Sequence, residues 1–177
     1  MVRADNLHPT VFLIDFGLAQ LYRNPATYLH NPDSKDHFVV GTLPFTSIAG
    51  QRGFAQSRRD DLESLVYTII YSARGALPWS VSANSADSYH GAVLQKKISI
   101  TTEELCEGLP TPFSEFVNYV RSLGFDQKPD YQNLHSILSL CSATKTRPPA
   151  ANTDCTPVFS GRVYVNSFYL NHASLWY

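Results

Sequence analysis

The chain has 177 residues, a formal net charge of -1 and 44% hydrophobic residues, a composition typical of one globular domain with enough apolar side chains to form a core. The 14 basic residues balance the 15 acidic ones, so we expect neither nucleic acid nor an anionic membrane as a partner. The N-terminal residues are polar where a signal peptide needs an apolar core, and no apolar run is long enough to span a bilayer.

The three cysteines are Cys106, Cys141 and Cys155. They lie far apart and include no C-x-x-C pair, so they do not indicate a zinc or redox site. We interpret them as reduced thiols, which agrees with a cytoplasmic or nuclear location.

A short run of β-branched and apolar residues at 10–14 predicts the second strand of a hairpin, because turn-forming residues precede it. The run ends at Asp15-Phe16-Gly17. Residues 23–53 contain several prolines and glycines and show no sustained periodicity. They predict a long loop, and loops of that length are usually functional.

The clearest helix signal covers residues 59–73. Its apolar residues follow the helical spacing i, i+3, i+4, i+7, i+8: Leu62, Leu65, Val66, Ile69 and Ile70. Ser57 or Asp60 is the expected N-terminal cap and Gly75 the expected end. Tyr67 and Tyr71 occupy the opposite face, so we expect this helix to be buried nearly all round and to be the most buried element.

Weaker helix patterns cover residues 87–97, 112–123 and 130–141, with Pro112 in a first turn, where it is tolerated. Beyond residue 141 the character changes to a proline-containing linker and then an aromatic segment with few charges. The sequence therefore predicts a mainly α unit with a short N-terminal β-hairpin at 1–141, followed by a divergent tail at 142–177.

Asp15-Phe16-Gly17 after a strand has the form of the protein-kinase magnesium motif. The Asp carboxylate is a hard oxygen ligand for a Mg²⁺ ion on nucleotide phosphates, the Phe packs beneath it, and the Gly lets the backbone turn. A given tripeptide of this kind occurs by chance in roughly 2 to 3% of chains of this length, so the motif needs support from its surroundings.

Further motifs supply that support. The segments that carry them are 14–19 with Tyr22-Arg23, then 41–42, 47–48, 56–65, 74–79, 105–110 and 128–131. In this order they resemble the casein kinase I family of serine/threonine protein kinases, with Ser47-Ile48 where most kinases have Ala-Pro-Glu. The resemblance covers residues 11–141, roughly three quarters of the chain.

The resemblance implies the C-terminal lobe of a kinase catalytic domain, entered just before the magnesium motif. Asp15, Phe16 and Gly17 would form the cofactor site for magnesium and ATP, with Asp15 as the metal ligand. Thr42 would contact the catalytic loop and shape the substrate site. Asp61 would accept catalytic-loop N–H groups at the head of the central helix, although by itself it also fits an ordinary acidic residue at a helix N-terminus.

The chain departs from the kinase pattern before Asp15. Kinases need a strand lysine, a glutamate that orients it, a Gly-rich loop and a catalytic loop, all N-terminal to the magnesium motif. The 14 residues before Asp15 contain no lysine, glutamate or glycine, and we interpret Asp5-Asn6 as a hairpin turn. We therefore assign no catalytic residue and expect the chain to be inactive alone, with binding of magnesium and ATP in doubt.

Smaller departures concern the substrate site. Family members usually have basic residues after the Gly-Thr pair and after Pro-Trp, whereas here 43–45 and 80–93 contain none. We expect Lys96 and Lys97 to lie on a solvated helix flank. Arg58 and Arg59 are expected to be structural, and Asp61, without its loop, to be solvated, to accept local N–H groups or to pair with these arginines.

Three interpretations stay open. The chain is part of a casein-kinase-I-like phosphotransferase that acts on protein serine or threonine, a non-catalytic kinase-like module that binds protein substrates or regulators, or a truncated gene product. The aromatic tail has strand propensity and few charges, so we expect deletion of residues 146–177 to improve the soluble yield.

Overall fold

The computed structural model describes residues 2–3, 10–80 and 86–143. In chain order its elements are β1 (Val2–Arg3), β2 (Thr10–Val11), the 3₁₀ helix η1 (Phe16–Leu18), α1 (Ile48–Gln51), α2 (Arg58–Arg74), α3 (Ala86–Ser99), α4 (Thr102–Leu105), α5 (Pro112–Ser122) and α6 (Tyr131–Ala143). The mainly α class is confirmed. The tail beyond residue 143 lies outside the described residues, as do the hairpin's turn residues Asp5 and Asn6.

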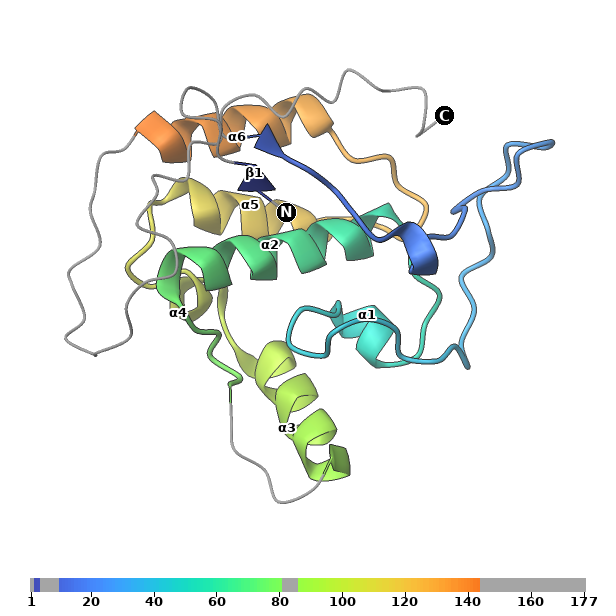
Figure 1. The fold of residues 1–177 in the computed structure, drawn as a ribbon, viewed down its shortest axis with the longest axis horizontal. Coiled ribbons are helices and arrows are strands. Elements are labelled where there is room, and N and C mark those ends of the chain that lie inside the picture. The colour runs from blue at the N-terminus through green and yellow to red at the C-terminus, as the bar shows by residue number, and fades with distance from the viewer. Residues whose placement is uncertain (1, 4–9, 81–85, 144–177) are drawn as a thin grey trace.

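The two short strands form the predicted N-terminal hairpin. They pair antiparallel, with Val2 opposite Val11 and Arg3 opposite Thr10. After β2 the chain passes through η1 and then extends away from the helices before it returns at α1 (Figure 1). Between η1 and α1 the described backbone forms turns and isolated bridges but no helix or strand, which agrees with the predicted long loop.

Helix α2 lies in the middle of the helical part (Figure 1). It packs against α5 and α1, while α5 also packs against α6 and α4, and α1 against α3. Two large aromatic residues, Tyr67 and Trp79, are almost completely buried beside α2 and meet edge to face, with their ring centroids 4.8 Å apart. The hydrophobic core is therefore built around α2.

The ends of α2 follow the sequence signals. The Asp60 carboxylate accepts the Ser57 N–H at 2.9 Å, which caps the N-terminus. Gly75 ends the helix with a left-handed φ of 77°, and its N–H donates to the Tyr71 carbonyl at 2.7 Å. Pro112 occupies the first turn of α5, as predicted.

The expectation that α2 is buried all round is wrong. Ile70 is fully buried and Ile69 partly buried, but the stripe Asp61, Leu65 and Thr68 is exposed. Among the described helices, only α1 and α5 pack their backbones closely on α2, and both do so away from this stripe, which stays uncovered.

The sequence interpretation missed two short helices, α1 and α4. Each is capped by a side chain: Ser47 Oγ accepts the Gly50 N–H at 2.9 Å, and Thr101 Oγ1 accepts the Glu104 N–H at 3.2 Å. The Glu104 carboxylate also accepts the Thr101 N–H at 3.1 Å. Thr101-x-x-Glu104 is the capping-box pattern and could have revealed α4. Within the ranges described, no helix combines the length and the apolarity that crossing a membrane requires.

Candidate functional site

The segment from Gly41 to Gln51, called the 41–51 segment below, joins the long loop to the helices. It begins with Gly41 at a left-handed φ of 94°. The Thr42 carbonyl then accepts the N–H groups of Phe45, at 2.9 Å, and Thr46, at 3.2 Å. This turn gives the backbone around Thr42 a defined shape. Thr42 itself is exposed.

Lys97 of α3 reaches across to this segment. Its Nζ donates to the Leu43 carbonyl at 2.8 Å, the Thr46 carbonyl at 2.6 Å and Gln51 Oε1 at 3.1 Å. An ammonium group has three N–H donors, so these three acceptors use all of them. The prediction of a solvated flank is correct for Lys96, which is exposed, and wrong for Lys97, which has no exposed surface.

Two aromatic rings lie beside the Lys97 ammonium group. Its Nζ lies 5.4 Å from the ring centroid of Tyr67 and 5.5 Å from that of Trp79, within range of cation–π attraction. Burial lowers the pKa of Lys97 from 10.5 to about 8, and the Glu63 carboxylate opposes this shift. The sequence analysis missed one signal for this position: Lys97 follows the apolar Val93 and precedes the apolar Ile100 at helical spacing, and the structure buries all three.

A second anchor joins the segment to Trp79. The indole Nε1 donates to the Pro44 carbonyl at 2.9 Å. Three of the four carbonyls at 43–46 therefore accept hydrogen bonds from buried side chains of the helical part, those of Trp79 and Lys97.

The end of the 41–51 segment is tied to α2 by two carboxylates. Ser47 Oγ donates to Asp60 Oδ1 at 2.6 Å, and the Ile48 N–H donates to Glu63 Oε1 at 3.0 Å. Burial raises the pKa of Glu63, while hydrogen bonds from the Tyr67 hydroxyl and the Ile48 N–H lower it. Sequence reasoning gave Asp60 only a capping role and gave Glu63 none, although both belong to the 56–65 motif.

Asp60 and Asp61 are neighbours with opposite environments. Asp60 is 1% exposed and accepts hydrogen bonds from Ser47 and Ser57. Its Oδ2 also lies 3.6 Å from Arg59 Nε. Asp61 is exposed, and within the described ranges its side chain forms no hydrogen bond or ion pair. Partial desolvation and, second, the Asp60 carboxylate raise the pKa of Asp61. Of the three expected outcomes for Asp61, the solvated one agrees with this exposure.

The arginines expected to be structural engage other groups. Arg59 pairs with Asp60, as stated, and Arg58 donates from Nη2 to the Asp126 carbonyl at 2.8 Å. The Arg58 guanidinium also lies over the Tyr22 ring, 4.5 Å from its centroid. These contacts tie the start of α2 to the turn after α5 and to the long loop.

Asp15 has a left-handed backbone, with φ 63° and ψ 70°, and its Oδ1 accepts the Gly17 N–H at 3.4 Å. Asp15 is exposed, and Phe16 is 65% exposed. The expectation that the Phe packs beneath the metal ligand is therefore wrong in this chain, because η1 contributes no buried residue and lies on a segment whose side chains are exposed.

The chemistry of Asp15 fits a magnesium ligand in part. Mg²⁺ is often held by one or two carboxylates together with water and phosphate oxygens, so a single accessible carboxylate suits it. Within the part of the chain that the structure describes, no group of three His, Cys, Asp or Glu side chains gathers. Asp15, Thr42 and Asp61 lie in separate elements, and no hydrogen bond or ion pair between described atoms joins any two of them.

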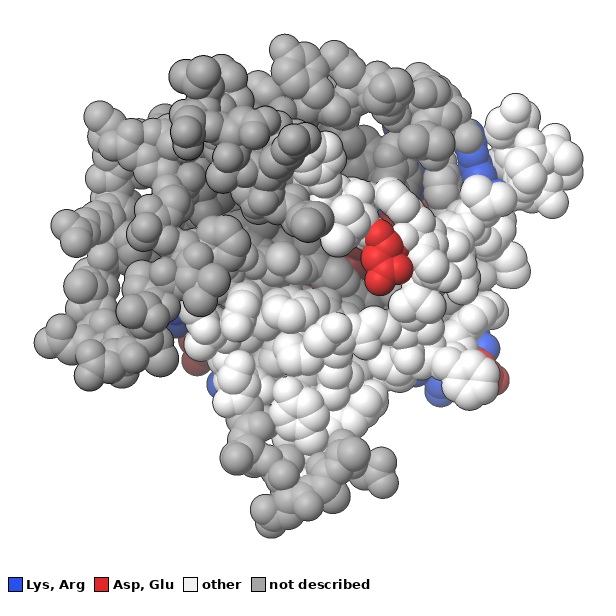
Figure 2. Space-filling view, viewed as in Figure 1, with Lys and Arg blue, Asp and Glu red and all other residues white. Residues whose placement is uncertain are grey.

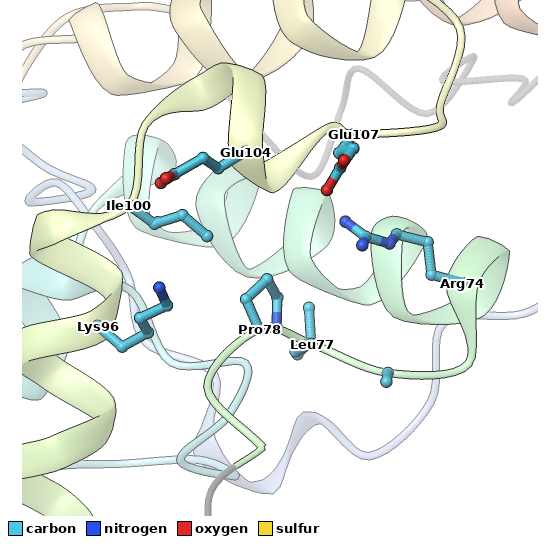
Figure 3. A pocket seen from close by; sticks show the side chains of 8 residues that line it. Arg74, Leu77, Pro78, Lys96, Ile100, Glu104 and Glu107 are labelled. Atoms are coloured by element: carbon cyan, nitrogen blue, oxygen red, sulfur yellow. The ribbon is translucent and has the colours of Figure 1, made fainter.

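A surface pocket lies where the end of α2 meets α3 and α4 (Figure 3). Its lining includes Arg74, Pro78, Lys96, Glu104 and Glu107. Arg74 Nη1 already donates to the Leu105 carbonyl at 3.0 Å. The lining includes none of the predicted site residues, so this pocket is separate from the predicted site.

Comparison with known proteins places these features in a family. No family model matches the chain. The chain is 44% identical over 129 residues to casein kinase I homolog 2 of Schizosaccharomyces pombe. The aligned residues make up 72% of this chain and 29% of the relative. The chain thus spans about three tenths of the length of that curated relative. Together with the helical structure, this match shows that the chain belongs to the casein kinase I family, of which it represents the C-terminal-lobe region.

Proposed function

We propose that the chain is the substrate-binding part of a casein-kinase-I-type serine/threonine protein kinase and that it does not transfer phosphate by itself. In this proposal residues 1–141 form the kinase-lobe unit, the 41–51 segment receives the protein substrate, and Asp15 contributes a magnesium ligand. Magnesium and ATP are the cofactors that the family relationship suggests.

The observation that carries the proposal is the fixed shape of the 41–51 segment. Backbone carbonyls at 43, 44 and 46 accept hydrogen bonds from Lys97 and Trp79, and the following Ser47-Ile48 is bonded to α2 carboxylates. A preorganised segment binds a peptide without the entropy cost of ordering itself. Thr42, next to these anchors, is exposed and available to a substrate.

The absence of turnover follows from the chemistry of phosphoryl transfer. When bound, Mg²⁺ neutralises charge that develops on the phosphates, and positioned cationic and carboxylate side chains do the remaining work. The chain provides Asp15 for the metal but has no lysine, glutamate or glycine before it. We therefore expect the phosphates to be held too loosely for transfer.

Peptide binding tests the proposal. The ¹⁵N-labelled chain is titrated with an acidic serine-containing peptide, and shifts are expected at the amides of residues 41–43, 45 and 46. Thr42→Ala should weaken binding several-fold, whereas Thr68→Ala, at an exposed position on α2, should not. Shifts that avoid the 41–51 segment, or equal effects of the two variants, would contradict the proposed substrate site.

A second function, protein binding without chemistry, is favoured by one observation. Large apolar side chains near η1 are exposed: Leu13 by 75%, Phe16 by 65%, Leu18 by 68% and Leu21 by 69%. The described part of the face in Figure 2 is mostly uncharged, with one acidic patch near its middle and lysine and arginine side chains near its margins. A partner of this face would be recognised by apolar contact. Retention of peptide binding at 41–46 after Leu13→Gln and Leu18→Gln would separate the two functions.

A further inference from the structure

We propose that Lys97 is a positioning residue for the protein substrate, because its ammonium group holds the backbone of the 41–51 segment in the shape that receives the peptide. This inference rests on the proposed function. The hydrogen bonds of Lys97 all go to the 41–51 segment, so it acts through the backbone next to Thr42.

The hydrogen bonds of Lys97 show how its ammonium group holds the 41–51 segment. The carbonyls of Leu43 and Thr46 lie three residues apart and point to one Nζ atom, at 2.8 and 2.6 Å. Their common partner fixes the intervening turn, which begins at Thr42. The third acceptor, Gln51 Oε1, is itself oriented, because its Nε2 donates to the His90 carbonyl at 2.9 Å.

Only a side chain with several hydrogen-bond donors can bind these acceptors at the same time. An apolar residue at 97 would pack against Tyr67 and Trp79, but it would donate nothing to the carbonyls of Leu43 and Thr46. The Leu43 carbonyl would keep only the Thr46 N–H, at 3.3 Å, and the Thr46 carbonyl would lose its Lys97 donor. The free energy of the 41–51 segment would then be lowered by a rearrangement that turns these carbonyls toward water, where they find new hydrogen-bond donors. The lost hydrogen bonds lie in the 41–51 segment and not in α5 or α6, so the local effect on this segment should exceed the effect on those helices.

The neighbouring lysine provides a matched control. Lys96 and Lys97 have the same side chain and adjacent positions on α3, but Lys96 is exposed and lines the pocket in Figure 3. Lys97→Met and Lys96→Met therefore remove the same charge and introduce the same side chain. Only the first removes the hydrogen bonds to the 41–51 segment.

Amide hydrogen exchange of the full 177-residue chain tests the inference. In Lys97→Met the amides of Phe45 and Thr46, which donate to the Thr42 carbonyl, should exchange at least tenfold faster than in the wild type. Amides of α5 and α6 should change less than twofold. In Lys96→Met all of these amides should keep wild-type rates.

Peptide affinity provides the second measurement. Lys97→Met should weaken binding of the acidic serine peptide at least tenfold, and Lys96→Met should leave it unchanged. If the wild-type chain binds no peptide, the proposed function fails, while the exchange comparison still decides whether Lys97 holds the segment.

Two exchange results would overturn the inference. Wild-type rates at Phe45 and Thr46 in Lys97→Met would show that Lys97 does not hold the segment. Equal acceleration throughout α5 and α6 would show that it serves only general stability. If Lys97→Met does not fold, Lys97→Gln, whose amide keeps two donors, is measured in its place and is expected to accelerate exchange at Phe45 and Thr46 only.

Discussion

Asp60 and Asp61 show how strongly the environment of one residue determines its role. The Asp60 carboxylate is buried and accepts hydrogen bonds from Ser47 and Ser57, whereas Asp61 is exposed. We expect Asp60→Asn to lower the free energy of unfolding by about 2 kcal/mol, because hydrogen bonds to a buried charged group are lost. Asp61→Asn should change it by less than about 0.5 kcal/mol. Urea unfolding of both variants measures this difference, and equal effects would contradict the assigned environments.

The buried ammonium of Lys97 predicts a pH dependence. Its pKa is about 8 in the folded chain and 10.5 for an ordinary lysine, so between these values the folded form binds fewer protons than the unfolded form. The free energy of unfolding of the wild type should therefore rise with pH across this window, relative to that of Lys97→Met. The Glu63 carboxylate is the charged neighbour that opposes this shift.

Denaturant unfolding of the wild type and Lys97→Met at pH 7, 8, 9 and 10 checks this sign. A difference between the two proteins that is flat or that falls across the series would show that burial does not lower the pKa of Lys97.

At the scale of the elements, alanine substitutions at two glycines with free space around them should have opposite effects on stability. An added Cβ would meet nothing within 4 Å at Gly75 or at Gly91, but Gly75 has φ 77° and Gly91 lies inside α3. Gly75→Ala should destabilise the chain by about 1 kcal/mol through backbone strain, and Gly91→Ala should stabilise it by about 0.5 to 1 kcal/mol through helix propensity. Thermal unfolding of both variants decides, and shifts of the same sign would be inconsistent with the two backbone conformations.

The long helices were predictable because apolar spacing and caps agree within each of them. The predicted 59–73 and 112–123 correspond to α2 and α5, each within one residue at both ends. The four-residue helices α1 and α4 are too short to show a period, so only their caps could reveal them. The exposed stripe on α2 was not predictable, since the same apolar and tyrosine pattern fits a helix packed on one side or on all sides.

Part of the candidate site was also predictable. The motifs located Asp15, Thr42 and Asp61, whose roles are still predictions. The structure adds that all three residues are exposed. The hydrogen bonds of Lys97 could not be derived from the sequence, because they join α3 to a segment about 50 residues earlier in the chain. Helical spacing with Val93 and Ile100 could have placed Lys97 on a buried face, but the sequence analysis expected a solvated flank.

For the whole molecule, the exposed apolar side chains near η1 predict poor solubility. Leu13 and Leu21 are 75% and 69% exposed, so replacing both with glutamine should raise the soluble concentration without changing the unfolding midpoint. Leu134→Gln, at a position only 4% exposed, should instead destabilise the fold. Static light scattering and urea unfolding of the three proteins measure both effects, and an unchanged soluble concentration of the double variant would contradict the prediction.

Transfer of the γ-phosphate of ATP to an acidic serine peptide by the purified 177-residue chain, with magnesium and ATP at millimolar levels, tests the central claim most directly. We predict that the rate does not exceed that of Asp15→Ala measured in parallel, although the peptide perturbs the amides of residues 41–43, 45 and 46. Transfer by the wild-type chain that Asp15→Ala abolishes would contradict the account, because it would show that this chain by itself holds the nucleotide in a reactive position.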